Sequence, residues 1–100
     1  MPRIRLSVPH DLGQEEAKKR VANLIAETRA QFGAQVSDVT EVWTECVDTF
    51  SFRALGFLVA GKLEVQAAQL LVDIDLPFAA LPFKGRVESE LLSRARQLLA

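Results

Sequence analysis

The sequence predicts an α+β fold in which two helices pack on one face of an antiparallel sheet. Residues 14–32 and 84–99 place apolar side chains at every third or fourth position, which is the pattern of an amphipathic helix. Most of the chain between them alternates polar and apolar residues with a period of two, as half-buried strands do. The connections within that region are short and therefore favour antiparallel neighbours. With one further strand at the start of the chain, the predicted order is β-α-β-β-β-β-α, in two layers.

The first strand is predicted over residues 3–8, where basic or polar residues alternate with apolar ones until Pro9. A loop with His10 and Asp11 follows, and Asp11 is a candidate cap for the next helix. The helix over 14–32 begins with acidic residues, as its dipole favours. Its apolar stripe consists of Ala17, Val21, Leu24, Ile25, Thr28 and Phe32.

Four strands are predicted in the middle of the chain, over 39–45, 47–54, 57–66 and 70–76. Leu55-Gly56 is predicted to be a turn. Gly61 lies inside a strand, which indicates a bulge, a bend or a close packing neighbour. The alternation leaves the facing of Trp43 open: it either covers the edge of the core or anchors an interface. The face away from the helices is predicted to carry Glu64, Asp73, Asp75 and Asp48.

Length and charge narrow the class of protein. One hundred residues are enough for one domain with a modest core, which we predict to span residues 1–100. The net charge is −1, and residues 36–83 carry two basic and seven acidic side chains, which disfavours nucleic acid as a partner. No apolar run reaches the roughly 18–20 residues of a membrane span. Cys46 is the single cysteine, so we expect no internal disulfide and a cytoplasmic location.

The residue types that carry catalysis are not gathered into any familiar arrangement. His10 and Asp11 are neighbours, but their place in a loop favours a surface or capping role. Cys46 has no adjacent base that would activate its thiol. Carboxylates that alternate along strands are typical of a solvated sheet face; these are Glu41, Glu45, Asp48, Asp73 and Asp75. We therefore predict no enzyme activity, no metal site and no cofactor.

The tripeptide Leu-Pro-Phe occurs twice between the last strand and the last helix, at 76–78 and 81–83. The simpler interpretation is structural: the prolines end the strand, and the apolar side chains fill the open end between sheet and helices. The functional interpretation is that some of these side chains stay exposed as an apolar contact patch with a basic rim. The residues of this candidate patch are Phe78, Leu81, Phe83, Lys84 and Arg86.

Several short motifs resemble those of one family of small bacterial proteins. They are Leu12-Gly13, the helix from Glu15, Phe50 and Phe52, the run Gly61/Leu63/Val65, and Pro82-Phe83-Lys84-Gly85 with Glu88 and Leu91. The family is that of the putative polyhydroxyalkanoic acid system proteins, also described as granule-region proteins, and the resemblance extends over residues 3–99. It implies a role in polyhydroxyalkanoate storage, because members are encoded near polyhydroxyalkanoate genes and some are found at granule surfaces. It implies no catalytic residues.

The order of elements also resembles a shortened START-related helix-grip architecture, in which a C-terminal helix crosses a curved sheet and encloses an apolar ligand. The chain is shorter than that architecture and has an early long helix and few strands. A core of this size has little volume to leave unfilled.

Three functions follow from these patterns. The first is a non-enzymatic accessory protein that binds the granule surface, or a granule-associated protein, through the candidate patch. The second is a carrier or sensor of a small apolar ligand, with a pocket between helices and sheet lined by Phe50, Phe52, Val59 and Leu91. The third is an interaction module, such as a homodimer through the open sheet face or an edge strand.

Overall fold

The computed structural model describes residues 3–54 and 56–100, without the side chain of Phe32. Within these residues lie β1 (Arg3–Pro9), α1 (Gln14–Phe32), β2 (Val36–Thr44), β3 (Val47–Ala54), β4 (Phe57–Val65), β5 (Gln69–Asp75), the 3-10 helix η1 (Phe78–Phe83) and α2 (Lys84–Leu98). This order confirms the predicted β-α-β-β-β-β-α sequence of elements. The predicted turn at Leu55 and the place of the Phe32 side chain in the helical stripe lie outside the described residues.

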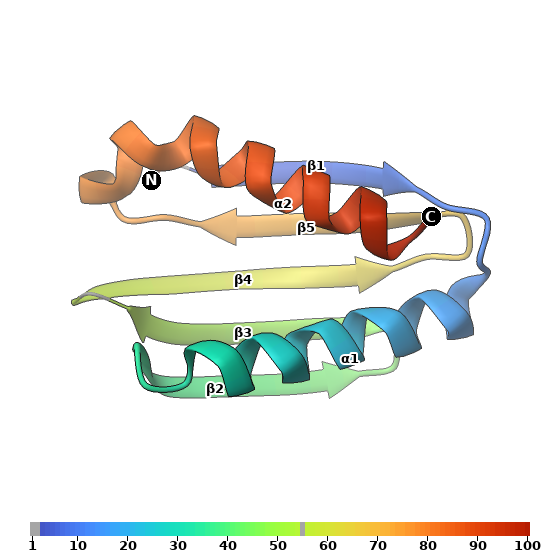
Figure 1. Cartoon of the computed structure of the whole chain (residues 1–100), viewed down its shortest axis with the longest axis horizontal. Helices are drawn as coiled ribbons and strands as arrows, with labels where there is room; N and C mark the ends of the chain where they lie inside the picture. Colours follow the sequence, from blue (N-terminus) through green and yellow to red (C-terminus); the bar gives the residue numbers. More distant parts are fainter. Residues whose placement is uncertain (1–2, 55) are drawn as a thin grey trace.

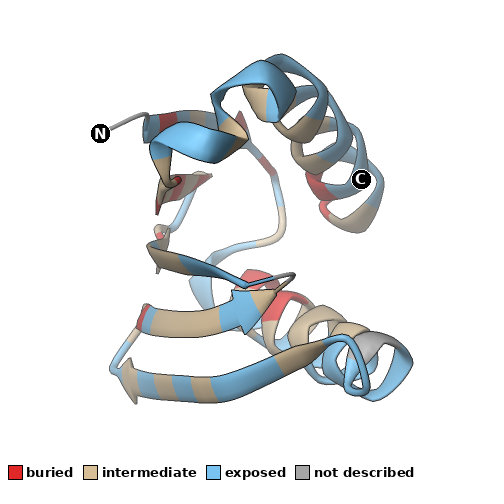
Figure 2. Ribbon diagram, turned by 90° about the vertical axis from the view of Figure 1, so that its left-hand side faces the viewer, coloured by how far each residue is buried: buried red, intermediate tan, exposed pale blue. Residues whose placement is uncertain are grey.

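The five strands form one antiparallel sheet in the order β1-β5-β4-β3-β2. The first strand therefore pairs with the last one, and α1 carries the chain across to the far edge (Figure 1). Both helices lie on the same side of the sheet, α2 over β1 and β5 and α1 over β2 and β3 (Figures 1 and 2). The fold is thus the predicted two-layer arrangement.

The strand register assigns each side chain to a face, because directly paired residues of an antiparallel sheet point the same way. On the helix-covered face, one row crosses the sheet through Leu6, Val72, Leu63, Asp48 and Trp43. Most of the buried apolar side chains come from β1, from β5 with Leu76, and from α2. The full set of buried apolar residues is Ile4, Val8, Ala17, Val21, Val65, Leu70, Val72, Ile74, Leu76, Ala95 and Leu99.

The two helices stand over opposite halves of the sheet and meet at one end. There, Arg20 Nη1 of α1 donates hydrogen bonds to the carbonyl oxygens of Leu98 and Ala100, each at 3.0 Å. The protein exposes 6556 Å², and a compact protein of this size exposes about 5,650 Å². Because the helices stand apart, side chains such as Phe52 and Val59 on the covered face are only half-buried. The fold therefore leaves more surface in contact with water than its mass requires.

Both edges of the sheet carry features that oppose the addition of another strand. β1 exposes Arg3 and Arg5 and ends at Pro9, which lacks a backbone donor. In β2 the register shifts between Ser37 and Thr40, and Asp38 between them has φ 53°. Such a bulge bends the edge and interrupts its ladder. The edges of the sheet therefore disfavour a dimer formed by strand pairing.

Gly61 has a close packing neighbour, which is one of the three explanations that the sequence allowed. A Cβ at this position would lie 2.7 Å from Phe50 Cζ and 2.9 Å from the carbonyl oxygen of Asp73. The missing side chain leaves room for the Phe50 ring directly opposite it on β3. The core therefore depends on glycine at this point of β4.

We predict that Gly61→Ala lowers the free energy of unfolding by about 1–3 kcal/mol, because the new methyl group overpacks the space beside Phe50. Urea unfolding followed by circular dichroism measures the change. Gly85→Ala is the matched control, since no heavy atom lies within 4 Å of a Cβ there. Inside α2 that change is expected to raise stability by up to about 1 kcal/mol. A Gly61→Ala variant as stable as the wild type would contradict the packing argument.

Candidate functional site

The η1 helix exposes three large apolar side chains, which we call the η1 patch: Phe78, Leu81 and Phe83. Their exposed fractions are 70%, 51% and 59%, and no residue of η1 is buried. The interpretation that they fill the open end between sheet and helices is therefore wrong. Leu76, which is 5% exposed, is the residue of this segment that belongs to the buried core. The chain turns outward directly after it.

Two prolines and a half-buried alanine set the orientation of η1. Pro77 is extended at φ −67° and ψ 155° and accepts a 2.9 Å hydrogen bond from the amide of Ala80, which closes the first turn. Ala80 packs against the core, so the larger residues around it face water. A 3-10 helix has three residues per turn, which places Phe78 and Leu81 on one side. Pro82, inside η1, restricts the backbone further.

The predicted basic rim follows the patch at the start of α2. Lys84 Nζ lies 3.8 Å from Glu88 Oε1, four residues later in the same helix. Arg86 is exposed in the first turn of the helix. The rim is therefore partly neutralised by its own helix.

The four residues predicted to line a ligand pocket lie between the two layers. The rings of Phe50 and Phe52 are stacked, with centroids 6.3 Å apart, and Val59 is paired with Phe52 on the same face. All three, like Leu91 of α2, are half-buried. Two open hollows of about 290 and 430 Å³ lie elsewhere, over β1 and β5 and beside the start of α1, and none of the four residues lines them. The ligand pocket stays a prediction.

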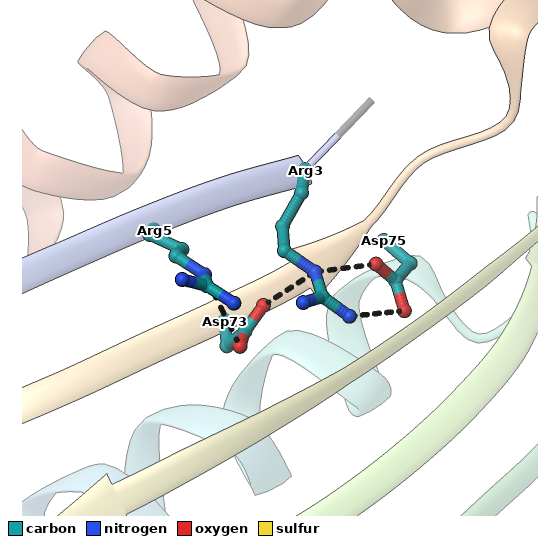
Figure 3. Close-up of polar contacts among 4 residues, drawn as sticks. All are labelled: Arg3, Arg5, Asp73 and Asp75. Carbon is teal, nitrogen blue, oxygen red and sulfur yellow. Dashed lines mark hydrogen bonds and ion pairs between the residues drawn. The ribbon is translucent and has the colours of Figure 1, made fainter. Parts of the chain in front are cut away.

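An ion-pair network covers the outer face of β1 and β5 (Figure 3). Arg3 Nε lies 2.8 Å from Asp75 Oδ1 and 3.2 Å from Asp73 Oδ1, and Arg5 Nε lies 3.7 Å from Asp73 Oδ2. The hydrogen bond from Arg3 holds the pKa of Asp75 below its usual value and raises the pKa of Arg3 itself. The prediction that Asp73 and Asp75 lie on the solvated face is correct, and arginines balance the charges of both carboxylates.

The assignment of Asp48 to the solvated face is wrong. Asp48 is fully buried on the helix-covered face, opposite Leu63 on one side and Trp43 on the other. Neither carboxylate oxygen has a hydrogen-bond partner among the residues that the structure describes. The sequence held a signal for this position, because Phe50 and Phe52 define the covered face of β3 and Asp48 is two residues earlier. The charge of Asp48 favoured an exposed position, and this was the opposite of what the periodicity indicated.

Burial, together with the neighbouring Glu41 carboxyl, raises the pKa of Asp48 to about 7. Glu41 is a diagonal neighbour on the covered face of β2 and lies 3.8 Å from Arg29 Nη1 of α1. Trp43 shares this face, half-buried against the core, with Lys18 Nζ 5.4 Å from its ring centroid. The facing of Trp43, which the pattern left open, is therefore inward under α1.

Two further expectations about the loop before α1 need correction. Asp11 does not cap the helix, whose N-cap is Gly13 at φ 79° without a side-chain cap. His10 is buried rather than on the surface: its Nδ1 accepts from the amide of Leu12 at 3.2 Å, and its Nε2 donates to the Gln66 carbonyl at 3.0 Å. The Nε2 bond, together with a 2.9 Å backbone hydrogen bond from the amide of His10 to the carbonyl oxygen of Ala68, joins this loop to the β4–β5 connection, whereas the Nδ1 bond lies within the loop.

Over residues 3–54 and 56–100, His, Cys, Asp and Glu side chains form no group of three that could hold a metal ion. In the same part of the chain no helix is long and apolar enough to cross a membrane. The η1 patch and the buried Asp48 are the two unusual features of the described surface and core.

Comparison with known proteins supplies a context for these features. The model of a family described as "putative polyhydroxyalkanoic acid system protein" matches residues 4–99. No curated protein matches the chain. Among solved structures, the crystal structure of TTHA0849 from Thermus thermophilus is similar, with 12% identity and a TM-score of 0.42. That similarity covers 98% of this chain and 92% of that one, and it is too remote to inform function.

We predict that Asp48→Asn stabilises the protein increasingly as pH rises. The pKa of Asp48 is about 7 in the folded state against an ordinary 3.8, so the folded state binds the proton more tightly. The wild type then loses stability as pH rises from about 4 to about 7. The variant does not, because it has no carboxyl group to ionise at this position. At pH 8 the gain in unfolding free energy should reach about 1–3 kcal/mol.

Chemical unfolding across this pH range measures the effect, and Glu27→Gln on the exposed side of α1 is the control. Equal pH profiles for the wild type and the Asp48→Asn variant would show that Asp48 does not titrate abnormally.

Proposed function

This chain belongs to the family of putative polyhydroxyalkanoic acid system proteins, and on that premise we propose that it is a non-enzymatic accessory protein that binds the surface of polyhydroxyalkanoate granules through the η1 patch. The observation that carries the proposal is the exposure of Phe78, Leu81 and Phe83 on one short, proline-restricted segment. The proposed location is the surface of storage granules in the cytoplasm.

The chemistry of the two surfaces supports this function. A polyhydroxyalkanoate granule is a polyester particle whose surface is largely apolar. Apolar burial contributes roughly 25 cal/mol for each Å² removed from water, so three large side chains can provide reversible attachment. Because the prolines hold η1 in one conformation, little further ordering is needed on binding. A granule-associated protein that covers the same patch is the alternative partner.

We predict that the double variant Phe78→Asp/Phe83→Asp binds protein-free polyester particles at least tenfold more weakly than the wild type, because charged residues would have to be desolvated. Co-sedimentation measures the bound fraction. Val42→Asp is the matched control, since Val42 is 62% exposed but lies on the outer face of β2. Thermal unfolding of each variant checks that the fold is retained.

A wild type that stays in the supernatant, or a double variant that pellets as well as the wild type, would contradict this function. Pelleting with native granules but not with protein-free particles would identify a granule protein as the partner.

A further inference from the structure

The chain topology collects three connections at one end of the sheet, which we call the η1 end. Because the strands alternate in direction, the α1–β2, β3–β4 and β5–α2 connections all lie at this end (Figure 1). The β1–α1, β2–β3 and β4–β5 connections lie at the other. The η1 patch is therefore one part of a surface to which distant segments of sequence contribute.

The β3–β4 hairpin contributes two more exposed apolar side chains, Phe57 and Leu58, which we call the hairpin tip. Their exposed fractions are 39% and 52%. The last pair between β4 and β5 at this end is Ala60 with Asp75, so the hairpin tip and η1 leave the sheet from neighbouring positions. Of the six exposed large apolar residues in the described chain, Val42 is the one that lies elsewhere. The other five gather at the η1 end.

The two residues of the hairpin tip point to opposite sides of the sheet, as successive residues of a strand do. Phe57 is paired with Ala54 on the helix-covered face, and Leu58 is paired with Arg53 on the outer face. A partner that touches both of them must approach the sheet end-on. This arrangement fits a broad surface and does not form a pocket for a small ligand.

Charge favours a neutral surface over an anionic one. Residues 54–61 and 76–83 contain no charged side chain. Three cations that border the η1 end are paired with carboxylates: Arg3 with Asp75 at 2.8 Å, Arg53 with Asp38 at 3.5 Å, and Lys84 with Glu88 at 3.8 Å. An anionic bilayer attracts clusters of unpaired Lys and Arg. Here Arg86 alone among the bordering cations lacks an ion pair within the described residues.

We propose that the η1 patch and the hairpin tip form one end-on docking face for a broad, uncharged apolar surface. The inference rests on the function proposed above and adds both a second contact segment and the charge of the partner surface. A second copy of this chain fits the face less well, since both sheet edges resist strand pairing and the apolar side chains project in different directions.

The test compares Leu58→Asp with the wild type, the Phe78→Asp/Phe83→Asp variant and the Val42→Asp control. Each protein is sedimented or floated with protein-free polyester particles, triacylglycerol droplets and anionic phosphatidylglycerol vesicles. We expect Leu58→Asp to weaken binding to both neutral surfaces about tenfold, as the loss of one buried leucine implies. Neutral-surface binding should not decrease with added salt, and binding to the vesicles should be weak. Leu58→Thr, which suits a strand, provides a second variant if Leu58→Asp unfolds.

The outcomes separate this inference from the proposed function. Suppose that the Leu58→Asp and Leu58→Thr variants bind polyester with wild-type affinity, while the Phe78→Asp/Phe83→Asp variant loses binding. This result would overturn the two-segment face and leave the proposed function standing. Binding to triacylglycerol droplets through both segments, with no binding to polyester, would support the face and overturn the proposed function. Preference for anionic vesicles, or a dimer in sedimentation velocity that Leu58→Asp dissociates, would overturn the neutral-surface inference. Binding to no surface would overturn both.

Discussion

The pairing of β1 with β5 is the interaction on which the rest of the structure depends. It joins residues 60 to 72 positions apart over a seven-residue register, from Arg3 with Asp75 to Pro9 with Gln69. The buried side chains of these two strands meet Ala95 and Leu99 from the C-terminal end of the chain and make up most of the core. This pairing also requires α1 to carry the chain to the far edge of the sheet, so that the remaining strands return one by one towards β5.

The η1 segment begins shortly after β5, just beyond the buried residue Leu76. Leu76 is 5% exposed and belongs to the buried core cluster. Pro77 then ends the ladder, and the larger side chains that follow are left in water. The apolar side chains of η1 are thus not part of the buried core, and this exposure is the observation from which the binding role is proposed.

The half of the molecule under α1 contains an energetically unfavourable feature, which is the buried carboxyl group of Asp48. Asp48 lies under α1 without a hydrogen-bond partner in the described structure, and a buried ionised carboxylate without a partner is costly. Near neutral pH this cost is reduced by protonation, since the pKa of Asp48 is about 7. Ionisation of Asp48 is therefore expected to destabilise this half of the protein, whereas the half built on β1, β5 and α2 is mainly apolar. The hydrogen bonds from Arg20 to the end of the chain beyond α2 connect the two halves.

The sequence by itself determined which segments are helices and strands and in what order, because the periods of two and about 3.6 are local properties of the chain. It also placed Asp73 and Asp75 on the solvated face, and its short motifs indicated the correct family. For Gly61 it allowed three explanations, of which the structure shows the close packing neighbour. Only the tertiary structure decided that β1 lies beside β5, that Asp48 is buried, and that Phe57 and Leu58 share one end with η1. These outcomes depend on which distant segments of the chain pack together and on how much space remains in the core. A local pattern of polar and apolar residues contains no information about either.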